Sequence, residues 1–262
     1  MSWILPLAFA ALQDDEALKP KWVTTEPALP DKADEGNPDM IALKGGGYLH
    51  FENREGGARV SRTVIFGKVA LQEGLIELFI CAEGGKDYES AVVTACDVQQ
   101  LDLSLVLSGM KKGKLRETLG APVEGEGSRV LVFAQWKDAE GNVRTCRVED
   151  LVHDTAKKRT MPRVGWTYIG AWEDDVDAVT QKPNGKKFLR AVRSRTLLAT
   201  FHDPGALLDN PIVTQARDDT TYFANRHALP PSGTDLKIFF RLPAADELKE
   251  IEALEKALAE EK

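Results

Sequence analysis

Apolar residues in this chain fall into short runs separated by turns that contain glycine or polar residues, a pattern typical of strands. β-branched and aromatic residues are frequent in these runs, as strands favour. The clearest hairpin signal is the pair of runs on either side of Asp138-Ala139-Glu140-Gly141-Asn142. The runs predict strands over 60–66, 75–80, 91–94, 129–136, 143–148, 166–172, 188–192, 196–201 and 237–242.

A helix is expected between Asp97, a favoured N-cap residue, and Gly109, which would end it. Leucine also occurs at every second position from Leu101 to Leu107, which is the period of a strand. We expect a helix because Asp97 and Gln100 have the spacing of a capping box. The residues that share one face of this helix are Val98, Leu101 and Leu105.

A second helix is expected at the C-terminus, beginning near Asp246. Its apolar stripe consists of Leu248, Ile251, Leu254 and Leu258. Together these patterns predict an α+β fold: a strand-dominated domain with one or two internal helices and a C-terminal amphipathic helix.

Four segments are expected along the chain. Residues 1–12 form a short uncharged apolar run that resembles the end of a signal peptide, although no Lys or Arg precedes it. An ordinary N-terminus is the alternative, and a membrane-spanning helix is excluded because it needs about 20 apolar residues. Residues 13–39 are acidic and rich in proline, so we expect a linker; residues 40–243 form the domain and residues 244–262 the terminal helix. The export signal predicts a periplasmic or otherwise extracytoplasmic location.

The formal net charge of −7 is concentrated at the ends of the chain. Residues 13–39 carry 8 acidic and 3 basic groups, and residues 244–262 carry 7 and 3. The remainder is close to neutral and has no concentrated basic surface for a phosphate backbone. Nucleic-acid binding is therefore not expected.

Three cysteines, Cys81, Cys96 and Cys146, are too few for a four-thiolate iron–sulfur or zinc site within this chain. In an exported protein, Cys81 and Cys96 can form a disulfide if their strands pair antiparallel and place them opposite each other. Buried free thiols are the alternative.

The segment between Gly84 and Ser90 carries the main candidate site, because charged groups and a hydroxyl crowd a glycine turn. A nucleophilic hydroxyl needs an adjacent base, which Lys86 or Glu89 would provide for Ser90. In an extended segment Lys86, Tyr88 and Ser90 would share one side. The alternative is a structural turn in which Glu89 accepts backbone hydrogen bonds or pairs with an arginine.

Histidines are few and widely spaced. The best seeds for a metal or acid–base site are His202-Asp203 and His153-Asp154, because a neighbouring carboxylate can orient an imidazole. Satisfied structural histidines are the commoner case, and we predict no metal site. Nucleophile-elbow, Walker A and dinucleotide-binding motifs are absent, so no cofactor is predicted.

Several short motifs occur in an order that resembles the YdjY-type domain found in exported bacterial proteins. They are Gly85-Lys86-x-x-Glu89-Ser90, Leu107-Ser108-Gly109, Trp166-x-x-x-Gly170, 204–211, Phe223 and Leu229-Pro230-Pro231-Ser232-Gly233-Thr234, within residues 45–243. The resemblance implies no assigned activity. The family is sometimes described as ferredoxin-like, but this sequence has no cysteine cluster. Tyr88 stands where the family often has histidine, so this chain lacks an imidazole at that position.

Two functions are therefore considered. The first is a non-catalytic exported module that binds another envelope protein or a surface ligand. The second is an enzyme or metal-dependent accessory protein that uses the Lys86–Ser90 turn, together with His202 and Asp203. Convergence of these side chains in one open pocket would favour the second.

Overall fold

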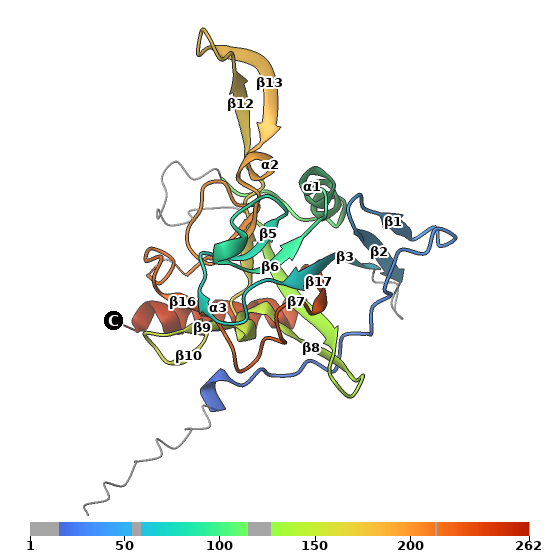
Figure 1. Cartoon of the computed structure of the whole chain (residues 1–262), viewed down its shortest axis with the longest axis vertical. Helices are drawn as coiled ribbons and strands as arrows, with labels where there is room; N and C mark the ends of the chain where they lie inside the picture. Colours follow the sequence, from blue (N-terminus) through green and yellow to red (C-terminus); the bar gives the residue numbers. More distant parts are fainter. Residues whose placement is uncertain (1–15, 54–58, 115–126, 213, 262) are drawn as a thin grey trace, which may run out of the picture.

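The computed structural model describes residues 16–53, 59–114, 127–212 and 214–261. Its central feature is a sheet that closes on itself into a barrel of eight strands (Figure 1). In hydrogen-bonding order the strands are β3 (Arg59–Val69), β17 (Asp235–Arg241), β7 (Arg129–Lys137), β11 (Trp166–Tyr168), β15 (Leu208–Asp209), β14 (Thr196–Ala199), β5 (Leu78–Ala82) and β6 (Ser90–Thr94). Strand β6 then pairs with β3 and completes the ring. The pairs β5–β6 and β14–β15 are parallel, and the other barrel pairs are antiparallel.

Closure depends on the length of β3. One edge of β3 pairs with β17, while the other edge pairs first with β2 (Gly47–Asn53) and then, from Gly67 onward, with β6. A Cβ atom at Gly67 would lie 2.8 Å from Val92 Cγ1 and 3.0 Å from the carbonyl oxygen of Val93. Glycine at this position therefore permits β6 to approach β3 closely enough to close the barrel.

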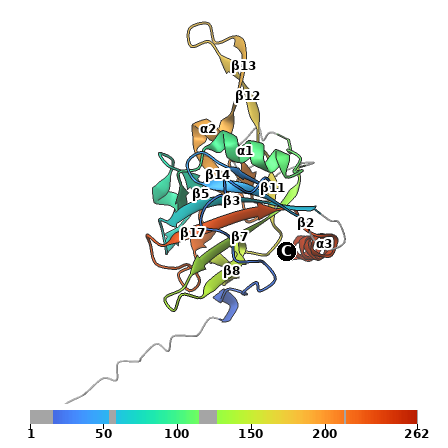
Figure 2. The same cartoon turned by 90° about the vertical axis from the view of Figure 1, so that its right-hand side faces the viewer.

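Shorter strands surround the barrel. Strands β1 (Met40–Ala42) and β2 extend the sheet beyond β3, and β8 (Val143–Arg147) pairs with β7. A four-stranded sheet contains β10 (Arg159–Thr160), β9 (Val152–Asp154), β16 (Tyr222–Ala224) and β4 (Gly74–Leu75). Strands β12 (Trp172–Val176) and β13 (Pro183–Leu189) form a separate hairpin that projects from the barrel (Figures 1 and 2).

Three short α-helices occur in the described part of the chain: α1 (Val98–Leu107), α2 (Arg190–Ser194) and α3 (Ala245–Glu260). Short 3-10 turns cover Glu16–Leu18 (η1), Asp87–Glu89 (η2) and Val148–Leu151 (η3). The predicted α+β fold is therefore wrong, because the domain is a closed β-barrel with few helical residues. The local patterns do not report closure, which arises from pairing between strands far apart in sequence.

Individual elements agree better with the sequence. The helix between Asp97 and Gly109, the hairpin of β7 and β8, and the C-terminal helix are confirmed. The run 75–80 instead contains β4 and β5 with a break between them, and 166–172 is broken between β11 and β12. The run predicted over 188–192 ends β13 and begins α2.

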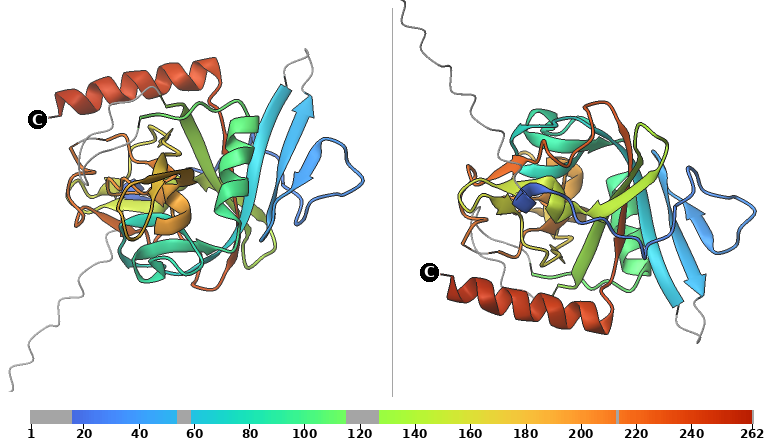
Figure 3. Two further views of the ribbon diagram at one scale, coloured as in Figure 1. Left: turned by 90° about the horizontal axis from the view of Figure 1, so that it is seen from above. Right: turned by 90° about the horizontal axis from the view of Figure 1, so that it is seen from below.

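Residues 16–39, here called the strap, pack against the barrel instead of forming a linker. Leu18 and Leu29 are buried, and Trp22 forms a β-bridge with Cys146 at the outer edge of β8. The strap then crosses the sheet (Figure 3, right). Its prolines prevent a helix but not burial, because buried leucines supply apolar contacts and the sheet supplies hydrogen bonds. The signal-like segment 1–12 lies outside the described residues.

Helix α3 lies along one side of the molecule (Figure 3). Of its predicted apolar stripe, Ile251 is buried, and Leu254 and Leu258 are partly buried against the core, whereas Leu248 is 39% exposed. Ion pairs complete the attachment: Arg241 donates to Glu247 at 2.7 Å, and Arg129 donates to Glu255 at 2.6 Å. The helix is therefore docked by a few apolar contacts flanked by charge pairs.

Candidate functional site

The glycine turn after β5 is held in a fixed shape. Gly84 has φ +78°, a conformation that favours glycine. A Cβ atom on Gly85 would lie 2.7 Å from the Cβ of Arg195 and 2.9 Å from the carbonyl oxygen of Ala82. Ala82 in turn donates its backbone N–H to the carbonyl of Arg195 at 2.8 Å. The two glycines therefore allow the turn to pack against the end of α2.

Lys86 lies between two carboxylates. Its Nζ is 2.6 Å from Glu77 Oε2 and 3.0 Å from Glu89 Oε2. Partial burial disfavours the charged ammonium, but the hydrogen bonds and negative charges of Glu77 and Glu89 outweigh this and raise the pKa of Lys86 above its usual value. Lys86 is therefore held in its protonated form.

Ser90 and Tyr88 do not extend this cluster. Residues 87–89 form the turn η2 instead of an extended segment, so the expected alternation of side chains does not occur. Ser90 is buried, and its hydroxyl donates to the backbone carbonyl of Lys86 at 2.6 Å. Tyr88 is 66% exposed. Glu89 pairs with Lys86 and not with an arginine. The arrangement stabilises the turn and presents no hydroxyl to a general base.

His202 and Asp203 are adjacent in sequence but have different partners. His202 is buried, and its Nδ1 lies 3.6 Å from Oδ1 of the buried Asp209. Asp203 accepts hydrogen bonds from the Gly205 N–H at 2.7 Å and from the Thr196 hydroxyl at 2.8 Å, so its carboxylate holds the loop that follows β14.

The Lys86–Ser90 turn and the His202-Asp203 pair both lie near Glu77, but they do not form one site. The carbonyl of Glu77 accepts hydrogen bonds from the N–H groups of Thr200 and Phe201, immediately before His202. The six predicted residues do not line the groove described below. Among the described residues, no group of three or more His, Cys, Asp and Glu side chains is placed to hold a metal ion.

All three cysteines are buried free thiols. Strands β5 and β6 run parallel, so the antiparallel arrangement required for a Cys81–Cys96 disulfide is not present. Burial away from water, with the nearby negative charge of Asp97, raises the pKa of the Cys96 thiol to about 12. The thiol form of Cys96 therefore predominates at neutral pH.

Helix α1 is the first of two surface features that were not predicted as sites. Asp97 caps the helix by accepting from the N–H groups of Gln99 and Gln100, each at 3.0 Å. The inner face buries Val98, Leu101 and Leu105. The outer face also carries large apolar side chains, at spacings of three and four residues: Leu103 is 55% exposed, Val106 43% and Leu107 51%. These three residues are called the α1 face below.

Helix α1 lies on the outside of the barrel (Figure 2). Residues three and four apart on a helix are neighbours on its surface, so the three side chains form one patch. Contiguous exposed apolar surface on a soluble domain commonly marks an interaction site. The signal for it was in the sequence, because the leucines at every second position place apolar residues on both sides of a helix.

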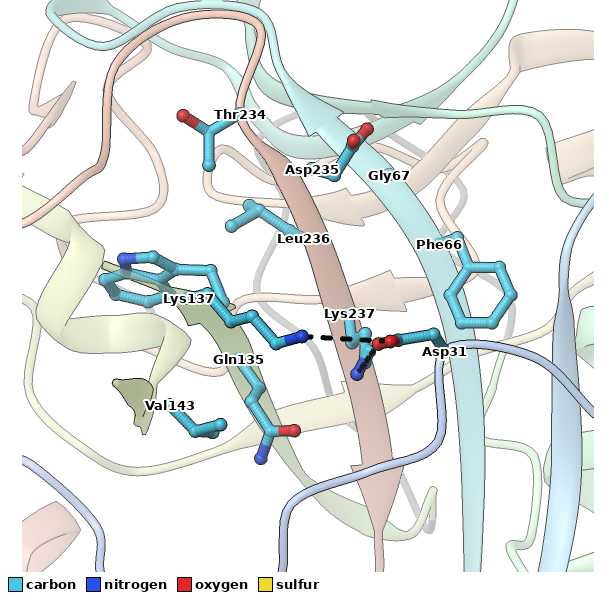
Figure 4. Close-up of a pocket in the computed structure, with 11 residues that line it drawn as sticks. Asp31, Phe66, Gly67, Gln135, Lys137, Val143, Thr234, Asp235, Leu236 and Lys237 are labelled. Carbon is cyan, nitrogen blue, oxygen red and sulfur yellow. Dashed lines mark ion pairs between the residues drawn. The ribbon is translucent and has the colours of Figure 1, made fainter. Parts of the chain in front are cut away.

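The second feature is a groove of about 530 Å³ across β3, β17, β7 and β8, called the β17 groove (Figure 4). Phe66, Lys237 and Gln135 lie opposite one another in register on three adjacent strands. The apolar lining is completed by Trp136, Val143 and Leu236. No sequence pattern predicts this groove, because its residues come together only through the pairing of distant strands.

The strap forms one end of the β17 groove. Gln135 accepts the N–H of Leu29 at 2.8 Å and donates its amide to the carbonyl of Pro27 at 3.0 Å. Lys237 donates to the carbonyl of Leu29 at 2.5 Å and pairs with Asp31. Lys137 extends into the groove toward Asp31, with its Nζ 3.9 Å from the carboxylate (Figure 4).

Among the described residues, no helix is both long enough and apolar enough to cross a membrane. The fold and surfaces define a β-barrel domain that presents an exposed apolar helix face and a groove of ligand size. The family model for the YdjY domain matches residues 59–241, and the chain therefore belongs to the YdjY domain family. No curated protein and no solved structure shows a significant match.

Proposed function

We propose that this chain is a non-catalytic extracytoplasmic module that binds another protein through the α1 face. The proposal rests chiefly on the exposure of Leu103, Val106 and Leu107 on a helix whose other face is already docked. Side chains at these spacings are the anchors by which a helix packs into an apolar groove of a partner. The extracytoplasmic location is supported by the signal-like residues 1–12.

The α1 face differs from the isolated apolar residues that occur on any protein surface. A singly exposed apolar residue needs no explanation, because much of any protein surface is apolar. Three adjacent ones on a single helix leave a patch in water that a partner would cover with a gain of about 25 cal/mol per Å² of apolar surface. The partner in this proposal is a protein with a complementary apolar surface.

The alternative function, an enzyme that uses the Lys86–Ser90 turn, has less support. An activated serine needs a base to accept its proton, but the Ser90 hydroxyl donates to a backbone carbonyl. Lys86 has a raised pKa because its ammonium group pairs with Glu77 and Glu89, so it is not a neutral base. His202 is buried, and its Nδ1 lies 3.6 Å from Oδ1 of Asp209.

Site-specific photocrosslinking in the producing cells tests the proposal. A photoreactive residue in place of Leu103 or Leu107 should give one discrete adduct with a second protein, identified by mass spectrometry. The same residue in place of Lys186, which is exposed on the projecting hairpin, is the control. Val106→Glu should abolish the adduct, because a charge would have to be buried at the interface.

Three outcomes would contradict the proposal. One is the absence of an adduct from positions 103 and 107. Another is the same adduct from position 186, which would indicate contact without a specific surface. The third is an adduct with the mass of two copies of this chain, which would make the α1 face a self-association surface instead.

A further inference from the structure

The β17 groove has the size and composition of a small-molecule site separate from the α1 face. Its volume of about 530 Å³ is within the range of roughly 300–1,000 Å³ that is typical of ligand pockets. Trp136 and Leu236 are buried beneath it, and Val143 is 43% exposed along one side. The aliphatic stems of Lys137 and Lys237 add apolar surface. An apolar body entering the groove would therefore cover Val143 and the stem of Lys137, which now contact water.

The charged residues that line the groove are Asp31, Asp235, Lys137 and Lys237, and they differ in how closely they are paired. Asp235 pairs with Lys68 at 2.6 Å, so these two charges neutralise each other. Asp31 pairs closely with Lys237, which also donates to a backbone carbonyl. Lys137 is the other lysine of the lining. Its side chain is 64% exposed, and its Nζ lies 3.9 Å from the Asp31 carboxylate, a longer contact than that of Lys237. Of the two lysines in the lining, Lys237 thus has a close carboxylate partner, whereas Lys137 has only the long contact.

The carboxylate of Asp31 is an example of an anionic group stabilised by the lysines of the groove. Although Asp31 is well exposed, hydrogen bonding to Lys237 and the positive charges of Lys237 and Lys137 lower the pKa of its carboxyl group. Two ammonium groups therefore already converge on one carboxylate at the strap end of the groove. A second anionic group placed beside Lys137 would meet a favourable potential.

We propose that the β17 groove binds a small amphiphilic anion. Its apolar body would lie against Phe66, Val143 and the aliphatic stems of the two lysines, and its anionic group would pair with Lys137. A cationic or zwitterionic ligand fits less well, because both carboxylates of the groove already have lysine partners. This site would give the module a ligand in addition to its protein partner.

A matched series of ligands tests the proposal: 4-phenylbutyrate, 4-phenylbutanol and 4-phenylbutylamine share one apolar body and differ in the charge of the end group. Binding to the full chain is measured by isothermal titration calorimetry, with tryptophan fluorescence as a second readout because Trp136 lines the groove. We expect the acid to bind about tenfold more tightly than the alcohol, and the amine most weakly. The preference should decrease as salt concentration rises.

Two variants locate the effect. Lys137→Met should remove the preference for the acid and leave binding of the alcohol unchanged, because the aliphatic stem is retained. Lys186→Met, a substitution of an exposed lysine on the projecting hairpin, should change neither. Equal affinities for the three ligands, no binding of any of them, or an unchanged acid preference in Lys137→Met would each overturn the proposal. None of these results bears on the α1 face, so its crosslinking test stands separately.

Discussion

Glu26 of the strap accepts two hydrogen bonds from the guanidinium of Arg62 on β3, at 2.9 Å and 3.1 Å. Arg62 is 1% exposed, and the same carboxylate also accepts from Arg241 of β17 at 2.7 Å. A segment outside the barrel thus supplies one carboxylate that two largely buried arginines share, while Glu52 also pairs with Arg62 and Glu247 with Arg241. The strap therefore contributes a buried carboxylate to the outer face of the barrel.

Glu26→Ala should lower the free energy of unfolding by about 1–3 kcal/mol, because it leaves buried guanidinium donors of both arginines unpaired, although Glu52 and Glu247 still compensate their charges. Urea denaturation followed by circular dichroism measures the change. Glu35→Ala is the matched control, since Glu35 is an exposed acidic residue of the same strap. Equal effects of the two substitutions would show that the strap contributes little to the fold.

The two faces of α1 should respond differently to substitution. Leu105→Ala should cost about 2–5 kcal/mol, because Leu105 is fully buried and its truncation leaves a cavity. Val106→Glu should change stability by less than about 0.5 kcal/mol, because its side chain already faces solvent. Thermal and urea unfolding of both variants measure this difference. A large loss in Val106→Glu would mean that this face is covered within the domain.

Thiol labelling tests the state of the cysteines. The native protein should react slowly or not at all with a thiol reagent such as Ellman's reagent, because all three thiols are buried and burial raises their pKa values. After unfolding in denaturant without reductant, all three should react. A single reactive thiol after unfolding would instead demonstrate a disulfide, and alkylation followed by peptide mapping would identify its cysteines.

Docking of α3 should weaken in acid. Burial opposes ionisation of Glu247, but hydrogen bonds from Arg241 and the Ala244 N–H, with the charge of Arg241, lower its pKa below the usual value of 4.5. A depressed carboxyl pKa stabilises the folded state above the unfolded pKa, and this contribution is lost as pH falls through the folded value. Protection of 245–260 against hydrogen exchange, corrected for the intrinsic rate, should therefore decrease from pH 6 to pH 3.

Glu247→Gln provides the control for this prediction. Glutamine retains much of the shape of the side chain but cannot ionise, so protection of α3 should already be lower at pH 6 and should fall less on acidification. Equal pH dependence in both proteins would assign the acid effect to other carboxylates.

The sequence predicted local structure well and long-range structure poorly. Asp97 and Gly109 bound α1 as expected because capping depends on residues close in sequence. Barrel closure was missed because it depends on Gly67 meeting Thr94 and on β17 pairing with both β3 and β7. Strand propensity gives no information about such pairings.

The candidate site shows the same division. The sequence drew attention to the segment from Lys86 to Ser90, but Asp87–Glu89 form the turn η2, and Lys86 pairs with Glu77, nine positions away, which the motif does not include. His202 and Asp203 were predicted to act together because they are adjacent in sequence. In the structure His202 instead lies beside Asp209 of β15. The β17 groove joins Phe66 to Lys237, and no pattern within one segment of the chain connects them.

The position of β17 also determines the order in which this protein can fold. Strand β17 lies between β3 and β7 and consists of Asp235–Arg241, so the ring remains open until these residues have been synthesised. Until then the edges of β3 and β7 are unpaired and can associate with other chains. Folding dominated by such distant pairings is slow. A nascent chain of this protein should therefore stay without its closed barrel until β17 has been synthesised, and in that state it depends on chaperones for protection.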